Sequence, residues 1–490
     1  MLGENKKSAS VVGTKPVDDH DVENTSADVA AVSQAEAVDY GYLRSWNFRT
    51  FYRSVLWQMI LFGALSLVGP AMQDAITNLG GGGLKTPWLA NLANSLNYTM
   101  GCLTTLFGGP LINKFGIKWS CMIAAVVFPL TGSAYYSNAK FGIDSYLLAS
   151  QVIGGIGGGF LYVAETTAML SYPKQDDRGF YLGIWAAMRN SGSVIGGAIN
   201  FATNSQHSSA GGIAWATYLI FVGFECTGVI WAFLLSPTKR VRRRDGSKVP
   251  MSGEITWKQE LQELGKYFTY KKTWLVFLPS FYSFFYGGTM GTYLSTHFSV
   301  RARALSTLLV PSCVIPLVIG YGRLLDMKHL SRRRRAWTAF LMWCLPHIFC
   351  FIWIGIEYGK FGNGKAALDY GLDTRRWAEA YLPYLIIFVT GYWTQLSLYW
   401  ILGELSTDVE GSARIGGLFR AFETAGQAVS YGINSIAGTH FPFYINAALL
   451  VLVMPCMVLL IKMVSAANVA GNRETVETEE VVANKQVDQS

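Results

Sequence analysis

Roughly a dozen hydrophobic stretches follow one another between Tyr52 and Val464, and each is about 20 residues long or longer. A helix rises about 1.5 Å per residue, so about 20 apolar residues are needed to cross the hydrocarbon core of a bilayer. No water is available there, and each backbone N–H and C=O must be paired within the segment, which favours helices. The pattern therefore predicts an all-α membrane protein with about twelve transmembrane helices.

The composition supports this interpretation and argues against other classes of protein. Of the 490 residues, 51% are hydrophobic and only 15% are charged. Soluble domains carry about 25% charged residues. The net charge of +8 could attract nucleic acid, but the basic residues lie in short segments beside the predicted spans, so we expect no nucleic-acid partner.

No pattern in the chain is typical of a catalytic or metal site. All seven cysteines fall inside predicted spans, and the chain has no CxxC motif and no Cys/His spacing of a metal site. Histidine clusters and nucleophile–base pairings are also lacking. We therefore expect no bound metal, no other cofactor and no enzymatic activity.

Polar segments divide the chain into five parts. The first and last segments are polar, acidic in patches and without apolar periodicity, which is typical of disorder. The predicted parts are a disordered cytosolic tail (1–43), an N-terminal six-helix bundle (44–235), a cytoplasmic linker (236–272), a C-terminal six-helix bundle (273–464) and a second disordered cytosolic tail (465–490).

The linker contains a helical pattern of its own. Apolar residues from Trp257 to Phe268 recur at helical spacing, and Thr256 and Gln259 are placed to form a capping box at the start. This pattern predicts a short amphipathic helix that lies on the cytoplasmic face of the membrane.

Lysine and arginine are distributed unevenly between the two sides of the membrane. With an even number of spans, both termini share a side, and that side carries basic runs such as 239–244 and 332–335. The positive-inside bias then places both termini in the cytoplasm. The plasma membrane and internal membranes are equally compatible with this pattern.

The two predicted bundles repeat each other in sequence. Residues 183–192 open the fifth span and residues 417–426 open the eleventh, with glycines and aromatic residues coinciding at an offset of 426 − 192 = 234. The turn at 109–114 after the second span is echoed by 322–327 after the eighth. Repeats of this kind place a substrate site at the interface between the halves, near the bilayer midplane.

The turn after the second span resembles a motif of the major facilitator superfamily, which reads Gly-x-Leu-Ala-Asp-Arg-x-Gly-Arg-Lys. Here the matching residues are Gly109, Leu111, Asn113, Lys114, Gly116 and Lys118. With the arrangement of six plus six helices, the resemblance covers about residues 48–464 and implies the major facilitator fold of two pseudo-symmetric six-helix bundles. It also implies cytoplasmic gating by Asn113, Lys114 and, in the second half, Asp326, although Asn113 lacks the charge of the family's aspartate.

The first span and its Gly-rich exit, residues 69–80, resemble the Unc-93-like branch of that superfamily, as do the two blocks opening spans five and eleven. The likeness is greatest to the fungal members. The branch includes transporter-like proteins as well as regulators of ion channels and trafficking partners of receptors. The resemblance therefore implies either role.

Two charges lie deep within predicted spans. Arg189 is nine residues past Phe180, roughly 13 Å inside the membrane, and Glu423 lies at matching depth on the repeat-related span. A charge at the bilayer centre is costly to insert, so each is a functional hypothesis. Their opposite signs predict an ion pair across the halves, which either controls transport or fixes helix packing. The alternative is that Glu423 pairs with Arg420.

Other residues are candidates for coupling or for substrate binding. Glu165 in the fourth span is a buried carboxylate that can take up and release a proton. Aromatic residues crowd spans seven and ten, among them Tyr282 and Trp393, with Gln395 nearby. These side chains line a cavity for an organic, partly apolar solute, or else form ordinary packing and interfacial belts.

The sequence thus predicts a secondary active transporter that moves a small organic solute by alternating access, with protons as the favoured coupling ion. The alternative is a non-transporting Unc-93-like regulator or trafficking partner of another membrane protein. We expect a monomer in the lipid bilayer with a small-molecule substrate. If the protein is instead a regulator or trafficking partner, we expect it to bind another membrane protein.

Overall fold

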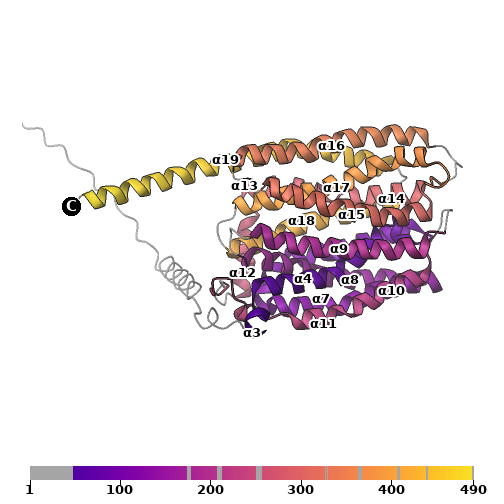
Figure 1. Cartoon of the computed structure of the whole chain (residues 1–490), viewed down its shortest axis with the longest axis horizontal. Coiled ribbons are helices and arrows are strands. Elements are labelled where there is room, and N and C mark those ends of the chain that lie inside the picture. The colour runs from indigo at the N-terminus through magenta and orange to yellow at the C-terminus, as the bar shows by residue number, and fades with distance from the viewer. Residues whose placement is uncertain are drawn as a thin grey trace, which may run out of the picture.

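The computed structural model describes residues 48–173, 178–206, 212–249, 256–325, 327, 329–361, 367–405, 409–436 and 440–487. Over these ranges the chain is almost entirely helical and forms no β-sheet. The long helices run side by side in two halves, drawn in indigo to magenta and in orange to yellow (Figure 1). The predicted all-α fold of two bundles is confirmed.

The first half and the linker contain α3 (Phe48–Tyr52), α4 (Val55–Val68), α5 (Pro70–Thr77), η1 (Gly81–Gly83), α6 (Pro87–Leu106), α7 (Gly108–Phe141), α8 (Asp144–Ser171), α9 (Arg178–Asn204), α10 (Trp215–Cys226), α11 (Gly228–Leu234), η3 (Thr238–Arg240) and α12 (Trp257–Tyr267). The second half contains α13 (Lys271–Ser283), α14 (Tyr286–His297), α15 (Val300–Leu325), α16 (Arg332–Lys360), α17 (Thr374–Leu405), α18 (Val409–Ile436) and α19 (His440–Val487). We call the end of the bundle that carries α3 and α12 the inner end, and the opposite end the outer end (Figure 1).

Eight helical segments of the described chain are long and apolar enough to cross a membrane. The other four predicted spans are helical too, but they are more polar: α6, α9, the pair α13 and α14, and α18. Their polarity follows from their position, because α6 packs along α18 and α9 along α15 at the interface between the halves. There, for example, Asn91 Nδ2 of α6 donates to Asn434 O of α18 (3.1 Å).

The first span of each half is broken. In the first half, α4 ends at Gly69 and α5 begins with Pro70, which lacks an N–H and is favoured in the first turn of a helix. A side chain at Gly69 would collide with the ring of Phe128. In the second half, Phe284 leaves the helical conformation (φ −121°, ψ 16°) between α13 and α14. Discontinuous helices of this kind are a common feature of transporter binding sites.

The predicted amphipathic helix of the linker is present as α12. Its capping box is formed as expected, with Thr256 N donating to Gln259 Oε1 (3.0 Å) and Gln259 N donating to Thr256 Oγ1 (3.4 Å). Leu264 of this helix packs against Leu418 and Phe422 of α18. One face of α12 therefore covers the inner end of the bundle. The expected position on the cytoplasmic face of the membrane stays a prediction.

Of the two predicted tails, only the C-terminal one falls largely within the described residues. The predicted disordered tail 1–43 lies outside the described residues. The predicted disorder of 465–490 is not what is found over 465–487, because α19 continues as one helix to Val487 and projects beyond the bundle (Figure 1). The segment contains alanine and glutamate and has no proline, so its composition permits a continuous helix.

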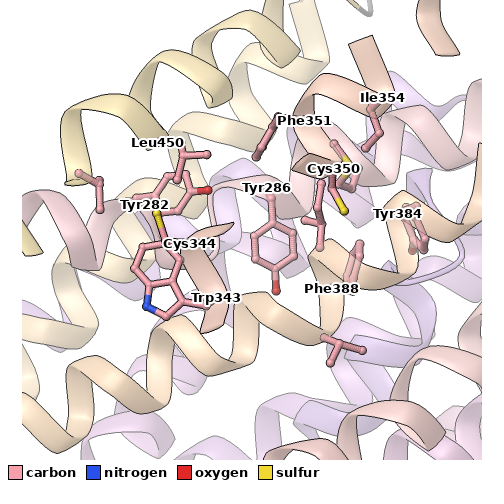
Figure 2. Close-up of a cluster of buried hydrophobic side chains, with 14 of the residues drawn as sticks. Tyr282, Tyr286, Trp343, Cys344, Cys350, Phe351, Ile354, Tyr384, Phe388 and Leu450 are labelled. Atoms are coloured by element: carbon pink, nitrogen blue, oxygen red, sulfur yellow. The ribbon is translucent and has the colours of Figure 1, made fainter. Parts of the chain in front are cut away.

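The second half has an aromatic core (Figure 2). Tyr282 and Trp343 are fully buried in it, and the Tyr282 hydroxyl is hydrogen-bonded to Nδ1 of His347 (2.8 Å). The hydrogen bond satisfies a polar group that would otherwise be costly among apolar side chains. The side chains of this aromatic core come from several helices, among them α13, α16 and α17, and hold these helices together.

Asp369 fastens the segment between α16 and α17 to the start of α15 at the outer end. Its buried carboxylate accepts hydrogen bonds from Arg301 Nε (2.7 Å), Ser299 Oγ and Gly371 N (2.8 Å). Burial raises the pKa of the Asp369 carboxyl, but these donors, with the charge of Arg301, lower it more, so the pKa lies below its ordinary value.

We expect Asp369→Asn to lower the melting temperature of the purified protein at pH 7, because Arg301 loses its anionic partner. The folded pKa is below the unfolded value of about 3.9, so the carboxylate's contribution to stability is complete above that pH and is lost as the pH falls through the folded pKa. The difference between variant and wild type should therefore shrink as the pH falls below about 4. Glu379→Gln, which removes the partner of the exposed Arg375, is the control and should change little. A difference that is independent of pH would contradict the assignment.

Candidate functional site

A cavity of about 150 Å³ lies between the two halves. Its walls come from α5, α6, α8 and α9 of the first half and from α14, α15, α17 and α18 of the second. The lining residues include seven tyrosines: Tyr98, Tyr162, Tyr286, Tyr384, Tyr392, Tyr399 and Tyr431. Such a wall presents ring faces together with hydroxyl groups, which suits a partly apolar ligand.

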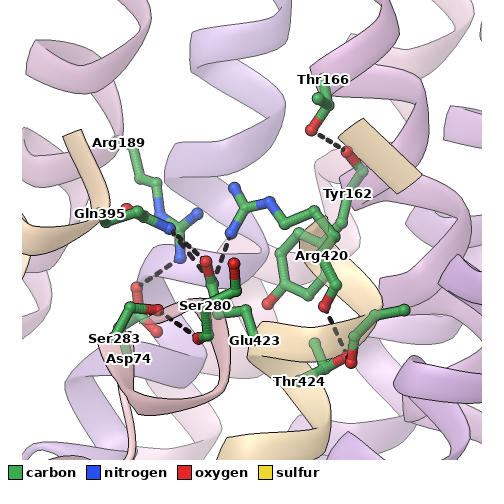
Figure 3. A network of polar contacts seen from close by, with 11 residues as sticks. Asp74, Tyr162, Thr166, Arg189, Ser280, Ser283, Gln395, Arg420, Glu423 and Thr424 are labelled. Atoms are coloured by element: carbon green, nitrogen blue, oxygen red, sulfur yellow. Dashed lines mark hydrogen bonds and ion pairs between the residues drawn. The ribbon is translucent and has the colours of Figure 1, made fainter. Parts of the chain in front are cut away.

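The first half contributes an ion pair to the cavity (Figure 3). Arg189 Nη2 of α9 donates to Asp74 Oδ2 of α5 at 3.0 Å, and the two side chains are 18% and 26% exposed. The guanidinium also lies 5.8 Å from the ring centroid of Trp185, one turn earlier on α9. Asp74 reaches the cavity because α5 continues the first span beyond its break at Gly69.

The second half contributes another pair. Arg420 Nη1 donates to Glu423 Oε1 on the same helix (2.7 Å), and Gln395 Nε2 of α17 donates to both oxygens of Glu423 (3.0 and 3.2 Å; Figure 3). Arg420 and Glu423 are only 5% and 2% exposed. The Arg420 guanidinium lies 5.3 Å from the ring centroid of Tyr162, so it also contacts the first half.

The structure brings three of the predicted site residues together at the cavity: Arg189, Glu423 and Gln395. The predicted ion pair between Arg189 and Glu423 is wrong, because each binds a partner within its own half. The alternative partner, Arg420, is the one found for Glu423. Asp74 was not predicted as a site residue. A carboxylate soon after a Gly-Pro break in a membrane span was the signal that could have identified it.

Glu165 lies beside the cavity wall and not in it. It is buried in α8, where its carboxylate accepts a hydrogen bond from Ser66 Oγ of α4. Ser66 Oγ accepts in turn from Nε1 of the cavity residue Trp185 (3.1 Å). Glu165 therefore contacts the cavity residue Trp185 through one intervening side chain, that of Ser66.

Two predicted aromatic residues lie elsewhere. Tyr282 belongs to the aromatic core of the second half, and Trp393 stacks on Tyr321 with ring centroids 5.0 Å apart. For these two residues the packing alternative is the one found, whereas Tyr286 and Gln395, which lie close to them in sequence, line the cavity. Successive residues of a helix point about 100° apart, so neighbours in sequence face different surroundings.

Two of the three predicted gating residues, Asn113 and Lys114, stand apart from the cavity. Asn113 and Lys114 are exposed on the first part of α7, next to a turn at Gly116 whose φ of +75° favours glycine. Asp326 lies outside the described residues. Gating by these three residues stays a prediction.

Arg303 joins the halves at the outer end. It belongs to α15, is 2% exposed, and donates to Leu79 O (2.6 Å) and Gly80 O (2.9 Å) of the first half. The four glycines 80–83 all have positive φ, a conformation that glycine adopts at little cost. A Cβ at Gly80 would lie only 2.6 Å from Gly291 O of α14.

Comparison with known proteins agrees with this architecture. Residues 55–431 match the Major Facilitator Superfamily model. Notoamide biosynthesis cluster protein O' of Aspergillus versicolor is 31% identical over 388 residues, covering 79% of this chain and 84% of that protein. UNC93-like protein 1 of Arabidopsis thaliana is 27% identical over 391 residues, covering 78% and 84%.

A UNC93-like protein of Schizosaccharomyces pombe is 26% identical over 444 residues, covering 84% of this chain and 86% of that protein. Among solved structures, a D-xylose–proton symporter superposes with a TM-score of 0.56 at 16% identity, covering 84% of this chain and 97% of the symporter. That likeness extends to the fold alone. The chain belongs to the major facilitator superfamily and, within it, to the UNC93-like branch.

Proposed function

We propose that the protein is a secondary active transporter that carries a small organic solute by alternating access, with protons as the coupling ion. The observation that carries the proposal is the cavity between the halves, which holds one ion pair from each half. Ionised side chains within membrane spans are costly and mark substrate or ion pathways in many membrane proteins. A site that both halves build changes its shape whenever the halves move.

The contacts between the halves suit a rocking motion. At the outer end Arg303 binds backbone carbonyls of the first half. At the inner end Leu264 of α12 packs with Leu418 of α18 and Leu106 of α6 in a small apolar cluster. Each set of contacts is compact, so the halves can separate at one end while they stay together at the other. By the distribution of lysine and arginine, the inner end faces the cytoplasm.

Carboxylates beside the cavity supply the proton sites. Asp74 and Glu423 each neutralise an arginine, and a carboxylate that loses such a partner in a poorly hydrated site takes up a proton. Glu165 is a third candidate, because its Oε2 is buried without a hydrogen-bond partner in the described part of the chain. Its link through Ser66 to Trp185 makes its surroundings sensitive to a ligand in the cavity.

The names of the relatives bear on the cargo. The relative from Aspergillus versicolor is a biosynthesis cluster protein, which supports a small organic solute. The similarity to UNC93-like proteins is also compatible with the regulator alternative, and a transport assay distinguishes a transporter from a regulator.

We expect Glu423→Gln to reduce proton-driven uptake by reconstituted vesicles to the level of protein-free vesicles. The amide keeps the shape of the side chain but cannot carry or exchange a proton, so folding is retained while coupling is lost. Uptake from a mixture of small metabolites would be measured under an imposed pH gradient. The matched control is Glu263→Gln on α12, which removes the partner of an exposed lysine at 2.6 Å and should leave uptake unchanged.

Uptake by Glu423→Gln equal to that of wild type would remove this residue from the mechanism. Wild-type vesicles that take up no solute, together with stoichiometric recovery of a channel or receptor with the protein from native membranes, would favour the regulator. Melting temperatures of both variants would show whether a loss of uptake reflects unfolding.

A further inference from the structure

We propose that the solute carried at this site is a small aromatic carboxylate, held between Arg189 and Arg420; this rests on the proposed transport function. The two arginines come from opposite halves and converge on the same part of the cavity (Figure 3). They are close enough for the positive charge of Arg189 to act unfavourably on that of Arg420. An anion placed between them relieves this repulsion and binds both halves at once.

Most of the hydrogen-bonding positions that remain unused on the charged side chains of the cavity are N–H donors. A guanidinium has five N–H donors, and one on each arginine is engaged by a carboxylate. Nε of Arg420 is buried with no partner in the part of the chain that the structure describes. Glu423, by contrast, already accepts from Arg420 and twice from Gln395. This imbalance favours an anionic ligand over a cation.

The cavity wall indicates an aromatic body for the ligand. Tyr98 and Tyr431 stack across the interface between the halves, with centroids 5.6 Å apart and planes inclined by 13°. With Trp185 they offer ring faces beside the arginines. A cavity of about 150 Å³ is the size that holds a single benzene-like ring. The buried hydroxyl of Tyr286, which has no partner among the described residues, can bond a polar ring substituent.

Charge balance couples this anion to a proton. The two arginines and their two carboxylates sum to zero, so one bound anion leaves the site with one excess negative charge. A carboxylate displaced from its arginine by the solute takes up one proton and restores neutrality. The groups that face Asp74 come from five helices: Arg189 of α9, Tyr98 of α6, Tyr162 of α8, Tyr392 of α17 and Tyr431 of α18. The groups that face Glu423 are Arg420 of its own helix and Gln395, Tyr392 and Tyr399 of α17. Glu165 of α8 is a further charged neighbour, because it acts on both Arg189 and Arg420.

The binding experiment uses the full-length protein in lipid nanodiscs and probes that share one ring: benzoate, benzenesulfonate, benzamide and benzylamine. We expect the two anions to bind at least about tenfold more tightly than the neutral and cationic probes at pH 7, because each charge-assisted hydrogen bond contributes that much or more. The double variant Arg420→Gln/Glu423→Gln removes both charges without leaving one unpaired, and it should lose this preference. Its matched control is the surface double variant Lys266→Gln/Glu263→Gln, which should keep it. If the first double variant does not fold, Arg420→Lys serves instead, with an intermediate loss, because lysine keeps the charge but not the fork of donors.

The flux experiment uses benzenesulfonate, which stays charged and does not leak through lipid as its acid. Proteoliposomes that contain a pH-sensitive dye should acidify inside when benzenesulfonate is added outside. Benzamide or benzylamine binding as tightly as benzoate, or no probe binding at all, would overturn the assignment of the solute and leave the transport function standing. Binding of both anions without any movement of benzenesulfonate would overturn the transport function and leave the binding site standing. Movement without acidification would overturn the coupled proton.

Discussion

Replacing Arg189 by glutamine is expected to lower solute uptake by proteoliposomes at least about tenfold and to remove its dependence on the pH gradient, since a hydrogen bond to a charged group contributes about 1.5–3 kcal/mol. Asp74 would lose its partner, and a carboxylate left unpaired in a poorly hydrated cavity takes up a proton and keeps it. A site that is permanently protonated cannot couple proton movement to transport. Initial rates of uptake, divided by the amount of reconstituted protein, measure the effect.

The partner variant makes this prediction specific. Asp74→Asn should also lose the proton dependence, and the double variant Asp74→Asn/Arg189→Gln should be no worse than the more severe single variant, because the two residues act as one unit. Arg375→Gln, which alters an exposed arginine at the outer end, is the control and should transport normally. Losses that add in the double variant would show that the two residues contribute independently.

The sequence was sufficient to predict the fold because the bilayer restricts what a long apolar chain can form. Hydrophobic stretches indicated helices, and the repeat of residues 183–192 at 417–426 indicated two related halves. The capping box of Thr256 and Gln259 located the start of α12. The four more polar spans were also recovered, because a predicted span tolerates polar residues where it faces another helix.

The candidate site was only partly predictable, for a geometric reason. Depth along a span follows from residue counting, and the two charges identified in this way, Arg189 and Glu423, both line the cavity. Pairing depends on how each helix is rotated and on where it breaks, which the sequence does not specify. The break at Gly69 and Pro70 carries Asp74 to Arg189, and the three-residue step along α18 carries Arg420 to Glu423.

A short stretch of the chain joins the cavity to the outer contact between the halves. Asp74 lies on α5, and five residues later the chain presents Leu79 O and Gly80 O to Arg303. A ligand that draws Arg189 away from Asp74 therefore acts on the short helix α5, and the chain reaches Leu79 and Gly80 directly after α5 ends at Thr77. This arrangement couples the ligand site to the outer contact through α5 and the turn that follows it.

Replacing Arg303 by glutamine is expected to open the outer end. Its hydrogen bonds to Leu79 O and Gly80 O join the halves, and each contributes about 1.5–3 kcal/mol because the donor is charged. Since 1.4 kcal/mol corresponds to a factor of ten, the population that is open at the outer end should rise at least about tenfold. The reporter is Ser295→Cys, a nearly isosteric change on α14 at a buried position beside Gly80. In a background whose native cysteines are replaced by serine, its rate of labelling by a membrane-impermeant maleimide should rise by the same factor.

The neighbouring Arg301 supplies the matched control for this experiment. Arg301→Gln removes an arginine two residues away whose partner, Asp369, lies within the same half, so it should lower stability without changing the labelling of Ser295→Cys. Arg303→Lys should fall between wild type and glutamine, because lysine keeps a charged donor for the carbonyls. Equal labelling in Arg303→Gln and wild type would mean that Arg303 only fills space between the halves. Increased labelling in both arginine variants would mean that loss of stability, and not release of the contact between the halves, exposes the reporter.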